Sequence, residues 1–289
     1  MNIKYINTSA LFNGLDGTTI NNSTRLCNKN GITYIEFTPF DKFDWVKLHF
    51  STRLGGVSKG IYSSMNFSFD RGDSYDNVYK NYELFLDTME LKPENCVCTK
   101  QTHTTNVLVA DSSMAGMGLT KPRSYDNVDG LVTNEPGLCL VTYFADCVPV
   151  YFIDPVNKCI GAAHSGWRGT VADITHETVQ LMNRTYGSKP EDIHAFIGPS
   201  ICQDCYEVDE AVAEKFRSVY SQNEIGMILY HTAGDKYQLN LQAANYFNMI
   251  HAGIKPDNIG ISDICTSCNS DWLFSHRASH GKRGVLCGF

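Results

Sequence analysis

Short apolar runs separated by Gly, Pro, Asp or Asn dominate the first half of the chain. Their length and their content of β-branched and aromatic residues predict β-strands. The three longest runs follow one another closely between Leu138 and His164, so strands and tight turns alternate there. The predicted strands cover residues 32–37 (ITYIEF), 45–50 (WVKLHF), 106–110 (NVLVA), 138–144 (LCLVTYF), 148–154 (VPVYFID) and 159–164 (CIGAAH).

A helical period of apolar residues interrupts the strands once and then becomes frequent beyond Gly169. Residues 76–90 place Val78, Tyr82 and Phe85 at steps of three and four, which is the spacing of one helix face. The same spacing predicts three further helices. The first ends at Gly187, and its apolar face holds Val171, Ile174, Thr178 and Leu181. The second begins at Val208 and includes Val212 and Phe216, and the third covers residues 239–252. Strands are predicted at 193–198 and 258–264 between these helices.

The order of these elements predicts the fold class. Strands and helices mix, but the strands are too unevenly spaced for a regular βαβ series, so we expect an α+β fold with mixed sheets. The sequence shows no internal repeat and no low-complexity linker, and we expect one domain over residues 1–289. Residues 112–126 form a long loop of small residues, a type that often acts as a lid or a functional loop.

Composition narrows the functional classes. The net charge of -7 and the absence of any basic tract argue against binding to nucleic acid. No apolar run has the eighteen or so residues of a membrane span, and the first residues lack the pattern of an export signal. The eleven cysteines are therefore expected to be reduced thiols in the cytoplasm rather than a disulfide framework.

Candidate chemistry concentrates in the stretch TYFADCVPVYFIDPVNKCIGAAHSGWRG, residues 142–169. Cys147 follows one predicted strand and His164 ends another, which is where a rigid element can aim a side chain into a cleft. Asp146 is a carboxylate at the inner end of an apolar run. The pair Cys147 and His164 is consistent with a nucleophile and its base, with two metal ligands, or with two ordinary core residues.

Further polar groups widen the candidate site. His103, in KQTH, adds a second imidazole, so that His103, Cys147 and His164 offer three zinc ligands with the fourth position open. Arg168, between two glycines at a helix start, is suited to holding an anion. Arg53 beside LGGVSKG and Arg277 in FSHRASHGKRG are further candidates.

Two CxxC pairs suggest a different metal site. Cys202 and Cys205 form one pair, and Cys265 and Cys268 form the other. Together they offer four thiolates for a structural zinc ion. About sixty residues separate the pairs and neither has the surroundings of a zinc knuckle, so this site is the less favoured interpretation.

Several ordered motifs together resemble a known family. They are STRLGGVSKG, MNFSFDRGD, KQTH, DNVDGLVTNEPGLCLVTYFADCVPV, AAHSGWRG, FIGPSICQDCYEV and FSHRASHGKRG. This set resembles the purine nucleoside phosphorylase family formerly called multicopper polyphenol oxidase or laccase-domain proteins. The resemblance covers residues 45–289, whereas residues 1–40 correspond to a variable part of the family and inherit no expectation from it.

The resemblance implies a zinc-dependent enzyme, with copper as an alternative metal. Its ligands would be His103, Cys147 and His164. We expect Cys147 and His164 to be catalytic together with Asp146, which is the carboxylate nearest to these ligands in the sequence. It implies phosphorolysis of adenosine, inosine and S-methyl-5'-thioadenosine, with adenosine deamination as a further activity, and purine nucleosides and phosphate as the partners. It also implies an α/β/β/α arrangement like that of the cytotoxic necrotising factor catalytic domain.

Phosphorolysis of an N-glycosidic bond requires a positioned phosphate and contacts to the ribose. The candidates for these contacts are Arg53, Arg168, Arg277 and Asn66, and Asp146 is the candidate proton shuttle for deamination. A metal-independent Cys-His hydrolase or deamidase is the main alternative, followed by a non-catalytic protein with a structural zinc ion. Copper oxidase chemistry is disfavoured because the chain has no HxH pair of histidines. We expect a monomer or a homodimer.

Overall fold

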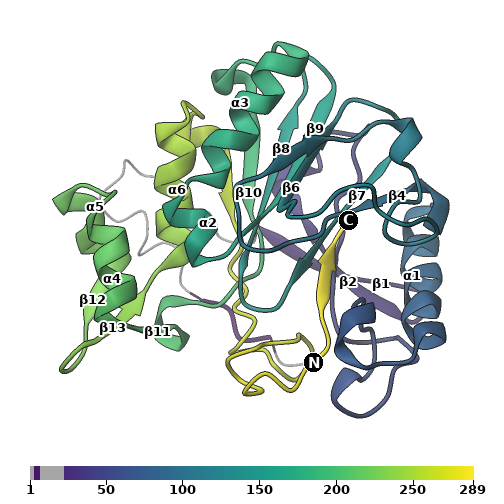
Figure 1. Cartoon of the computed structure of the whole chain (residues 1–289), viewed down its shortest axis with the longest axis horizontal. Helices are drawn as coiled ribbons and strands as arrows, with labels where there is room; N and C mark the ends of the chain where they lie inside the picture. The colour runs from purple at the N-terminus through teal and green to yellow at the C-terminus, as the bar shows by residue number, and fades with distance from the viewer. Residues whose placement is uncertain (1–2, 7–22) are drawn as a thin grey trace.

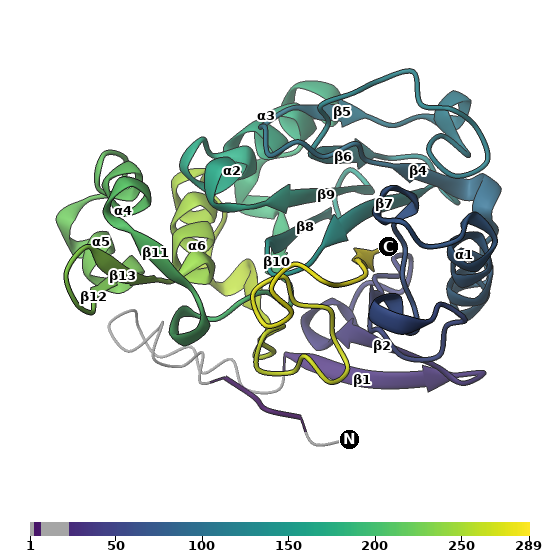
Figure 2. The ribbon, with the colours of Figure 1, turned by 60° about the horizontal axis from the view of Figure 1, so that its bottom comes forward.

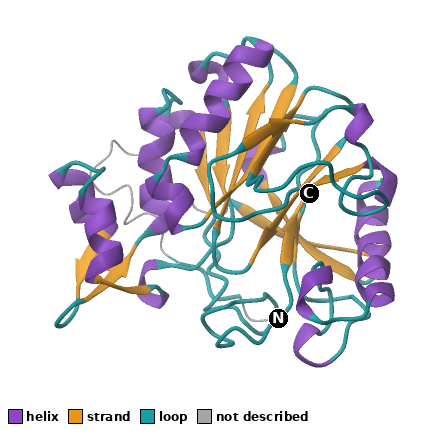
Figure 3. Cartoon of the chain, in the orientation of Figure 1, coloured by secondary structure: helices purple, strands orange, loops and turns teal. Residues whose placement is uncertain are grey.

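The structure is a computed structural model that describes residues 3–6 and 23–289. Two six-stranded mixed sheets face one another, and helices cover their outer faces (Figures 1 and 3). This arrangement confirms the α+β class that the element order predicts. A small three-stranded sheet and two short helices form a separate cluster beside the second sheet (Figure 1).

The first sheet has the order β1-β2-β3-β15-β7-β4, and the second has the order β14-β10-β8-β9-β6-β5. The strands of the first sheet are β1 (Thr24–Lys29), β2 (Ile32–Phe37), β3 (Phe50–Ser51), β4 (Cys96–Cys98), β7 (Cys139–Phe144) and β15 (Leu286–Gly288). Those of the second are β5 (Val107–Val109), β6 (Gly130–Thr133), β8 (Val148–Asp154), β9 (Cys159–Ser165), β10 (His194–Ile197) and β14 (Ile259–Ile261). The small sheet contains β11 (Glu207–Asp209), β12 (Leu229–His231) and β13 (Lys236–Leu239).

Six α-helices lie within the described residues. They are α1 (Tyr75–Met89), α2 (Trp167–Val171), α3 (Ile174–Tyr186), α4 (Glu210–Arg217), α5 (Gln222–Ile228) and α6 (Leu241–His251). Helix α1 packs the face that holds Val78, Tyr82 and Phe85 against the first sheet. Helices α3 and α6 pack against the outer face of the second sheet.

The apolar side chains between the two sheets form the central core. Phe37, Phe50 and Phe144 come from the first sheet, whereas Tyr151 and Phe196 come from the second. Every residue of β8 is buried, as expected for a strand with a core on both faces. The pattern of the sequence therefore identifies most of the elements that form the core, and the layers arise because each sheet contributes its own apolar face.

Most predicted strands are confirmed, but the one at 45–50 is wrong over most of its length. Only Phe50 enters β3. The segment before it turns back on itself, with the amide of Val46 donating to the carbonyl of Phe43 at 3.1 Å. Trp45, Val46 and Leu48 are half-buried against the inter-sheet core, so their apolar character reflects packing rather than strand pairing.

Two predicted helices begin elsewhere. The helix face proposed from Val171 to Leu181 is divided into α2 and α3, because Asp173 takes a left-handed conformation with φ 60° and caps α3 by accepting from the amide of His176. Val208 lies in strand β11, and α4 begins at Glu210 after the cap Asp209. The helix at 76–90 is confirmed as α1, and that at 239–252 as α6.

Two connections between the sheets determine where the functional site lies. Residues 145–147 lead directly from β7 of the first sheet to β8 of the second, and residues 99–106 lead from β4 to β5. The first connection carries Cys147 and the second carries His103, while β9 ends beside them at Ser165. Among the described residues, none of the helices has the length and apolar content needed to span a lipid bilayer.

Candidate functional site

His103, Cys147 and His164 converge, as the sequence predicts. One nitrogen of each imidazole and the Cys147 sulfur all lie within 4.8 Å of one another. The two imidazole rings meet edge to face, with their centroids 4.9 Å apart. His164 is buried at 4 % exposure, Cys147 is half-buried and His103 is exposed. The group therefore opens to solvent on the His103 side.

Asp129, which the sequence analysis did not identify, organises these residues. Its carboxylate is fully buried and accepts from Nδ1 of His164 at 2.8 Å. It also accepts from the amides of Thr102, His103 and Thr104 and from the Thr104 hydroxyl, each at 3.0 Å. One carboxylate thus orients the His164 ring and fixes the loop that carries His103, as expected of a partner behind metal ligands or behind a catalytic histidine.

The electrostatics of the group favour a thiolate. Burial would raise the pKa of Cys147, but the positive charge of His164 and hydrogen bonds from His103 and His164 lower that pKa to about 6. Burial would lower the pKa of His164, but the Cys147 thiolate and Asp129 raise it to about 9. An anionic sulfur beside two imidazoles is suited to binding a metal ion or to attacking an electrophile.

The glycine turn after His164 permits this close approach. A Cβ atom on Gly166 would lie 2.9 Å from Cδ2 of His103 and 3.2 Å from the Cys147 sulfur. The residue is glycine because the turn occupies the space directly beside the three side chains. Arg168, in the five-residue helix α2, is exposed and stacks on the ring of Trp167 at 4.2 Å.

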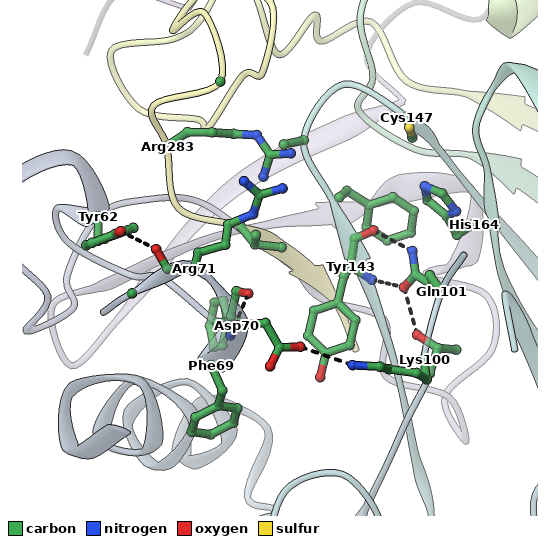
Figure 4. Close-up of a pocket in the computed structure, with 18 of the residues that line it drawn as sticks. Tyr62, Phe69, Asp70, Arg71, Lys100, Gln101, Tyr143, Cys147, His164 and Arg283 are labelled. Carbon is green, nitrogen blue, oxygen red and sulfur yellow. Dashed lines mark hydrogen bonds and ion pairs between the residues drawn. The ribbon is translucent and has the colours of Figure 1, made fainter. Parts of the chain in front are cut away.

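A cavity of about 650 Å³ adjoins the three side chains (Figure 4). Four cationic side chains line it, against the single carboxylate of Asp70, although the whole chain is acidic. These cations are Arg71, Lys100, Arg123 and Arg283. Lys100 pairs with Asp70 at 3.2 Å, and Arg123 donates through Nε to the carbonyl of Cys98 at 2.9 Å. The predicted loop at 112–126 contributes Arg123 to this wall.

Arg71 and Arg283 extend into the cavity beside one another (Figure 4). Arg283 donates through one terminal nitrogen to the carbonyl of Gly284 at 3.0 Å, and its Nε is buried without a hydrogen-bond partner within the described chain. Burial and the neighbouring Arg71 cation lower the pKa of Arg283 to about 10. Two cations held together in this way are suited to binding an anion.

The sequence analysis did not identify Arg71 or Arg283, and the three arginines that it proposed, Arg53, Arg168 and Arg277, lie outside the lining of the cavity. Arg53 donates to the carbonyls of Ser63 and Ser270 and lies over the ring of Phe274 at 4.7 Å. Arg277 donates to the carbonyls of Cys205 and Glu207. Backbone acceptors therefore occupy the guanidinium groups of both.

Asn66 and Asp146 are likewise engaged in contacts within the fold. The fully buried side chain of Asn66 donates to Asp73 and accepts from the amide of Val285. One carboxylate oxygen of Asp146 accepts from the Thr266 hydroxyl at 2.6 Å, and the other accepts from the amide of Arg277 at 2.7 Å. Asp146 thereby ties the Cys147 connection to the C-terminal segment.

The four cysteines of the CxxC pairs also converge, which corrects the argument against them from sequence separation. Their sulfurs all lie within 4.8 Å of one another, and the cluster could hold a metal ion. The contact brings the short turn at 203–205 against residues 265–268.

Comparison with known proteins identifies a family. The family model described as multi-copper polyphenol oxidoreductase laccase matches residues 47–289. The chain is 35 % identical over 244 residues to purine nucleoside phosphorylase YlmD of Bacillus subtilis, which covers 83 % of this chain and 86 % of that protein. It is 32 % identical over 231 residues to adenosine deaminase RL5 of an unknown prokaryotic organism, covering 79 % and 87 %. The crystal structure of the Bacillus licheniformis hypothetical protein YfiH matches with a TM-score of 0.84 at 33 % identity, covering 93 % of this chain and 98 % of that one.

Proposed function

The chain belongs to the multi-copper polyphenol oxidoreductase laccase family, and on that premise we propose that it is a purine nucleoside phosphorylase that also deaminates adenosine. The name of the Bacillus subtilis relative, purine nucleoside phosphorylase YlmD, supports the first activity, and the name of adenosine deaminase RL5 supports the second. The observation that carries the proposal is a basic cavity next to the His103–Cys147–His164 group in an otherwise acidic chain. The proposed substrates are adenosine, inosine and S-methyl-5'-thioadenosine.

The residues present fit a zinc ion at this group. Two imidazoles and one thiolate are zinc ligands, and three protein ligands with an open side are typical of a catalytic site. Gly166 leaves the space beside them that a Cβ would fill. We propose that His103, Cys147 and His164 hold zinc, with copper as the alternative metal. When bound, such an ion supplies Lewis-acid chemistry and lowers the pKa of bound water.

For phosphorolysis we assign phosphate binding to Arg71 and Arg283. The two guanidinium groups would hold the anion so that one of its oxygens can attack C1' of the ribose as the C1'–N9 bond breaks. The products are ribose 1-phosphate and the free base, which leaves with a proton. The cavity volume of about 650 Å³ is within the usual range for a small-molecule site. Asp146 is proposed to position the Cys147 connection, since both of its oxygens accept hydrogen bonds.

The test is to incubate metal-assayed protein with adenosine, with and without phosphate, and to separate adenine, inosine, hypoxanthine and ribose 1-phosphate. We expect adenine release that depends on phosphate and inosine formation that does not. A Cys147→Ala variant controls for contaminating phosphorylase. If the protein forms no product from any purine nucleoside, the proposed function is wrong.

Arginine variants test the phosphate assignment separately. Charge-assisted hydrogen bonds contribute about 1.5–3 kcal/mol each, so Arg71→Ala or Arg283→Ala should raise the KM for phosphate about ten- to a hundredfold. Deamination, which uses no phosphate, should change much less. Arg184→Ala, at the exposed end of α3, is the matched control and should leave both activities unchanged. Equal losses of both activities would contradict the assignment.

A metal-independent Cys-His hydrolase or deamidase is the second candidate function. Cys147, His164 and Asp129 have the order of a nucleophile, a base and an orienting carboxylate. The proposed likeness to the cytotoxic necrotising factor catalytic domain would favour this chemistry. Chelation distinguishes the candidates, because a hydrolase keeps its activity after the metal is removed and the phosphorylase loses it.

Copper oxidase chemistry is the least supported function, despite the name of the family. Among the described residues, histidines, cysteines and carboxylates converge in only two groups suited to a metal ion, and one of these groups has no histidine. The chain also lacks the HxH pairs from which multicopper centres are built. The test is to measure oxygen uptake by copper-loaded protein with a phenolic substrate. We expect none, and sustained uptake would show that this ranking of oxidase chemistry is wrong.

A further inference from the structure

A second cluster of metal-ligating side chains lies apart from the lining of the cavity. Cys202 and Cys205 flank a short turn after β10, and Cys265 and Cys268 lie in the segment after β14. All four sulfurs lie within 4.8 Å of one another. Each of the chain's cysteines is a free thiol in the structure, so no disulfide accounts for this convergence.

The spacing of the sulfurs fits a tetrahedral ion. Zinc–sulfur bonds of about 2.3 Å place the corners of a tetrahedron about 3.8 Å apart. The sulfur of Cys268 lies 3.9 Å from that of Cys202 and 3.5 Å from that of Cys205. A disulfide would require about 2.05 Å.

Backbone amides already point at the cluster. The sulfur of Cys265 accepts from the amide of Cys202 at 3.2 Å and from the amide of Cys268 at 3.4 Å. Cys265 and Cys202 are buried, whereas Cys205 and Cys268 are half-buried. Amide donors stabilise negative charge on sulfur, and the Arg277 guanidinium, which donates to the carbonyl of Cys205 at 3.5 Å, adds a nearby cation.

Few apolar contacts join the two segments, which are held by hydrogen bonds such as that from the amide of Thr266 to the carbonyl of Ser200 at 3.1 Å. The local apolar cluster contains only Ile201, Cys202 and Cys265 as buried members. The chain between β14 and β15, residues 262–285, forms turns without a helix or a strand of its own (Figure 2, yellow). A shared ion would cross-link positions that lie 63 residues apart in the chain, as Cys205 and Cys268 do.

We propose that Cys202, Cys205, Cys265 and Cys268 bind a structural zinc ion that fastens residues 262–285 to the turn after β10. Four protein thiolates complete the tetrahedron, so this site has no open position and no role in turnover by itself. The fastened segment carries Thr266 and Arg277, whose hydrogen bonds hold both oxygens of Asp146 beside Cys147. It also carries Arg283 of the cavity.

Metal counting on the purified full chain tests this proposal without reference to activity. The wild type should contain about two zinc ions per chain, and Cys147→Ala and Cys268→Ser about one each. The double variant should contain none. Cys27→Ser, which changes a half-buried thiol of β1 outside both clusters, should retain two.

A measurement on the wild type keeps the proposal testable if Cys268→Ser does not fold. Cys205 and Cys268 should resist alkylation in the native protein and become reactive when a strong chelator removes the metal, whereas Cys27 should react throughout. Cobalt loaded into Cys147→Ala should show the intense visible bands and sulfur-to-cobalt charge transfer of a tetrathiolate site.

Several outcomes would overturn the proposal. One zinc ion in the wild type and none in Cys147→Ala would show that the four cysteines bind none. A Cys205–Cys268 disulfide in protein purified without oxidant would replace the ion by a covalent link, and one iron per chain would contradict zinc. Zinc at the four cysteines without any phosphorolysis would leave this proposal standing and reject only the proposed function.

Discussion

The substitution Asp129→Asn tests whether one buried carboxylate organises the proposed metal centre. Asp129 accepts five hydrogen bonds, three of them from the amides of Thr102, His103 and Thr104. An asparagine keeps one acceptor oxygen and places an NH₂ group against donors, so at least two of these bonds are lost. At about 1.5–3 kcal/mol for each hydrogen bond to a charged group, the loss of two should lower the free energy of unfolding by about 3–6 kcal/mol.

The same substitution should weaken zinc binding by about ten- to a hundredfold, because the His164 ring and the His103 loop lose their common anchor. Urea unfolding measures the stability, and competition with a chromophoric chelator measures the affinity. Asp154→Asn is the matched control, since Asp154 is equally buried and accepts from the amides of Val156 and Asn157 away from the site. It should lower stability and leave zinc affinity unchanged. Zinc affinity of Asp129→Asn within twofold of the wild type would refute the reasoning.

Two further predictions concern stability and metal content. Gly166→Ala should reduce zinc content with little change in melting temperature, because its Cβ would crowd His103 and Cys147. Gly226→Ala is the control and should retain the metal, since a Cβ there meets nothing within 4 Å. Equal metal content in both variants would contradict this prediction. Burial lowers the pKa of His49 from 6.5 to about 4. Between these two pH values the unfolded chain binds a proton that the folded chain does not. The free energy of unfolding should therefore fall by about 3 kcal/mol as the pH drops from 6.5 to about 4. His49→Gln should flatten that part of the urea-unfolding pH profile, and an unchanged slope would show that another group controls it.

The apolar pattern predicts the strands that form the core and fails where packing rather than pairing buries a residue. Strands β7, β8 and β9 are continuous apolar runs, and their ends place Cys147 and His164 correctly. Trp45 and Val46 are apolar because they cover the core edge, and nothing local distinguishes this from a strand. The break at Asp173 depends on one residue with positive φ, which helical spacing cannot reveal.

The three proposed ligands could be named from the sequence, whereas the residues behind them could not. Asp129 acts through His164, which lies 35 positions away, and only the pairing of β6 with β9 brings them together. The signal available was a carboxylate directly before the short apolar run GLV. Arg71 and Arg283 stand beside glycines as Arg168 does, so sequence context could not show which of them faces the cavity.

The four-cysteine cluster shows why sequence separation is weak evidence against a site. About sixty residues divide the two CxxC pairs, but the parallel pairing of β10 with β14 brings the ends of both strands to the same edge of the second sheet. The isolated bridge between Ser200 and Cys265 continues that pairing. Since the carboxyl ends of parallel strands lie together, residues that follow them meet whatever the length of the connection. The spacing within each pair determines its local geometry, and the strand order determines which pairs combine.

The position of the candidate active site has the same kind of origin. A two-layer sheet structure needs segments that pass from one sheet to the other, and such segments cannot complete the hydrogen-bond ladder of either sheet. Here two of them run side by side, from β4 to β5 and from β7 to β8. The buried carboxylate of Asp129 accepts from backbone amides of the first, and the Asp146 side chain ties the second to the C-terminal segment. The side chains that these segments present, His103 and Cys147, are therefore held rigidly and still reach solvent at the cavity. Rigid support with an open face is the condition that metal-dependent chemistry requires.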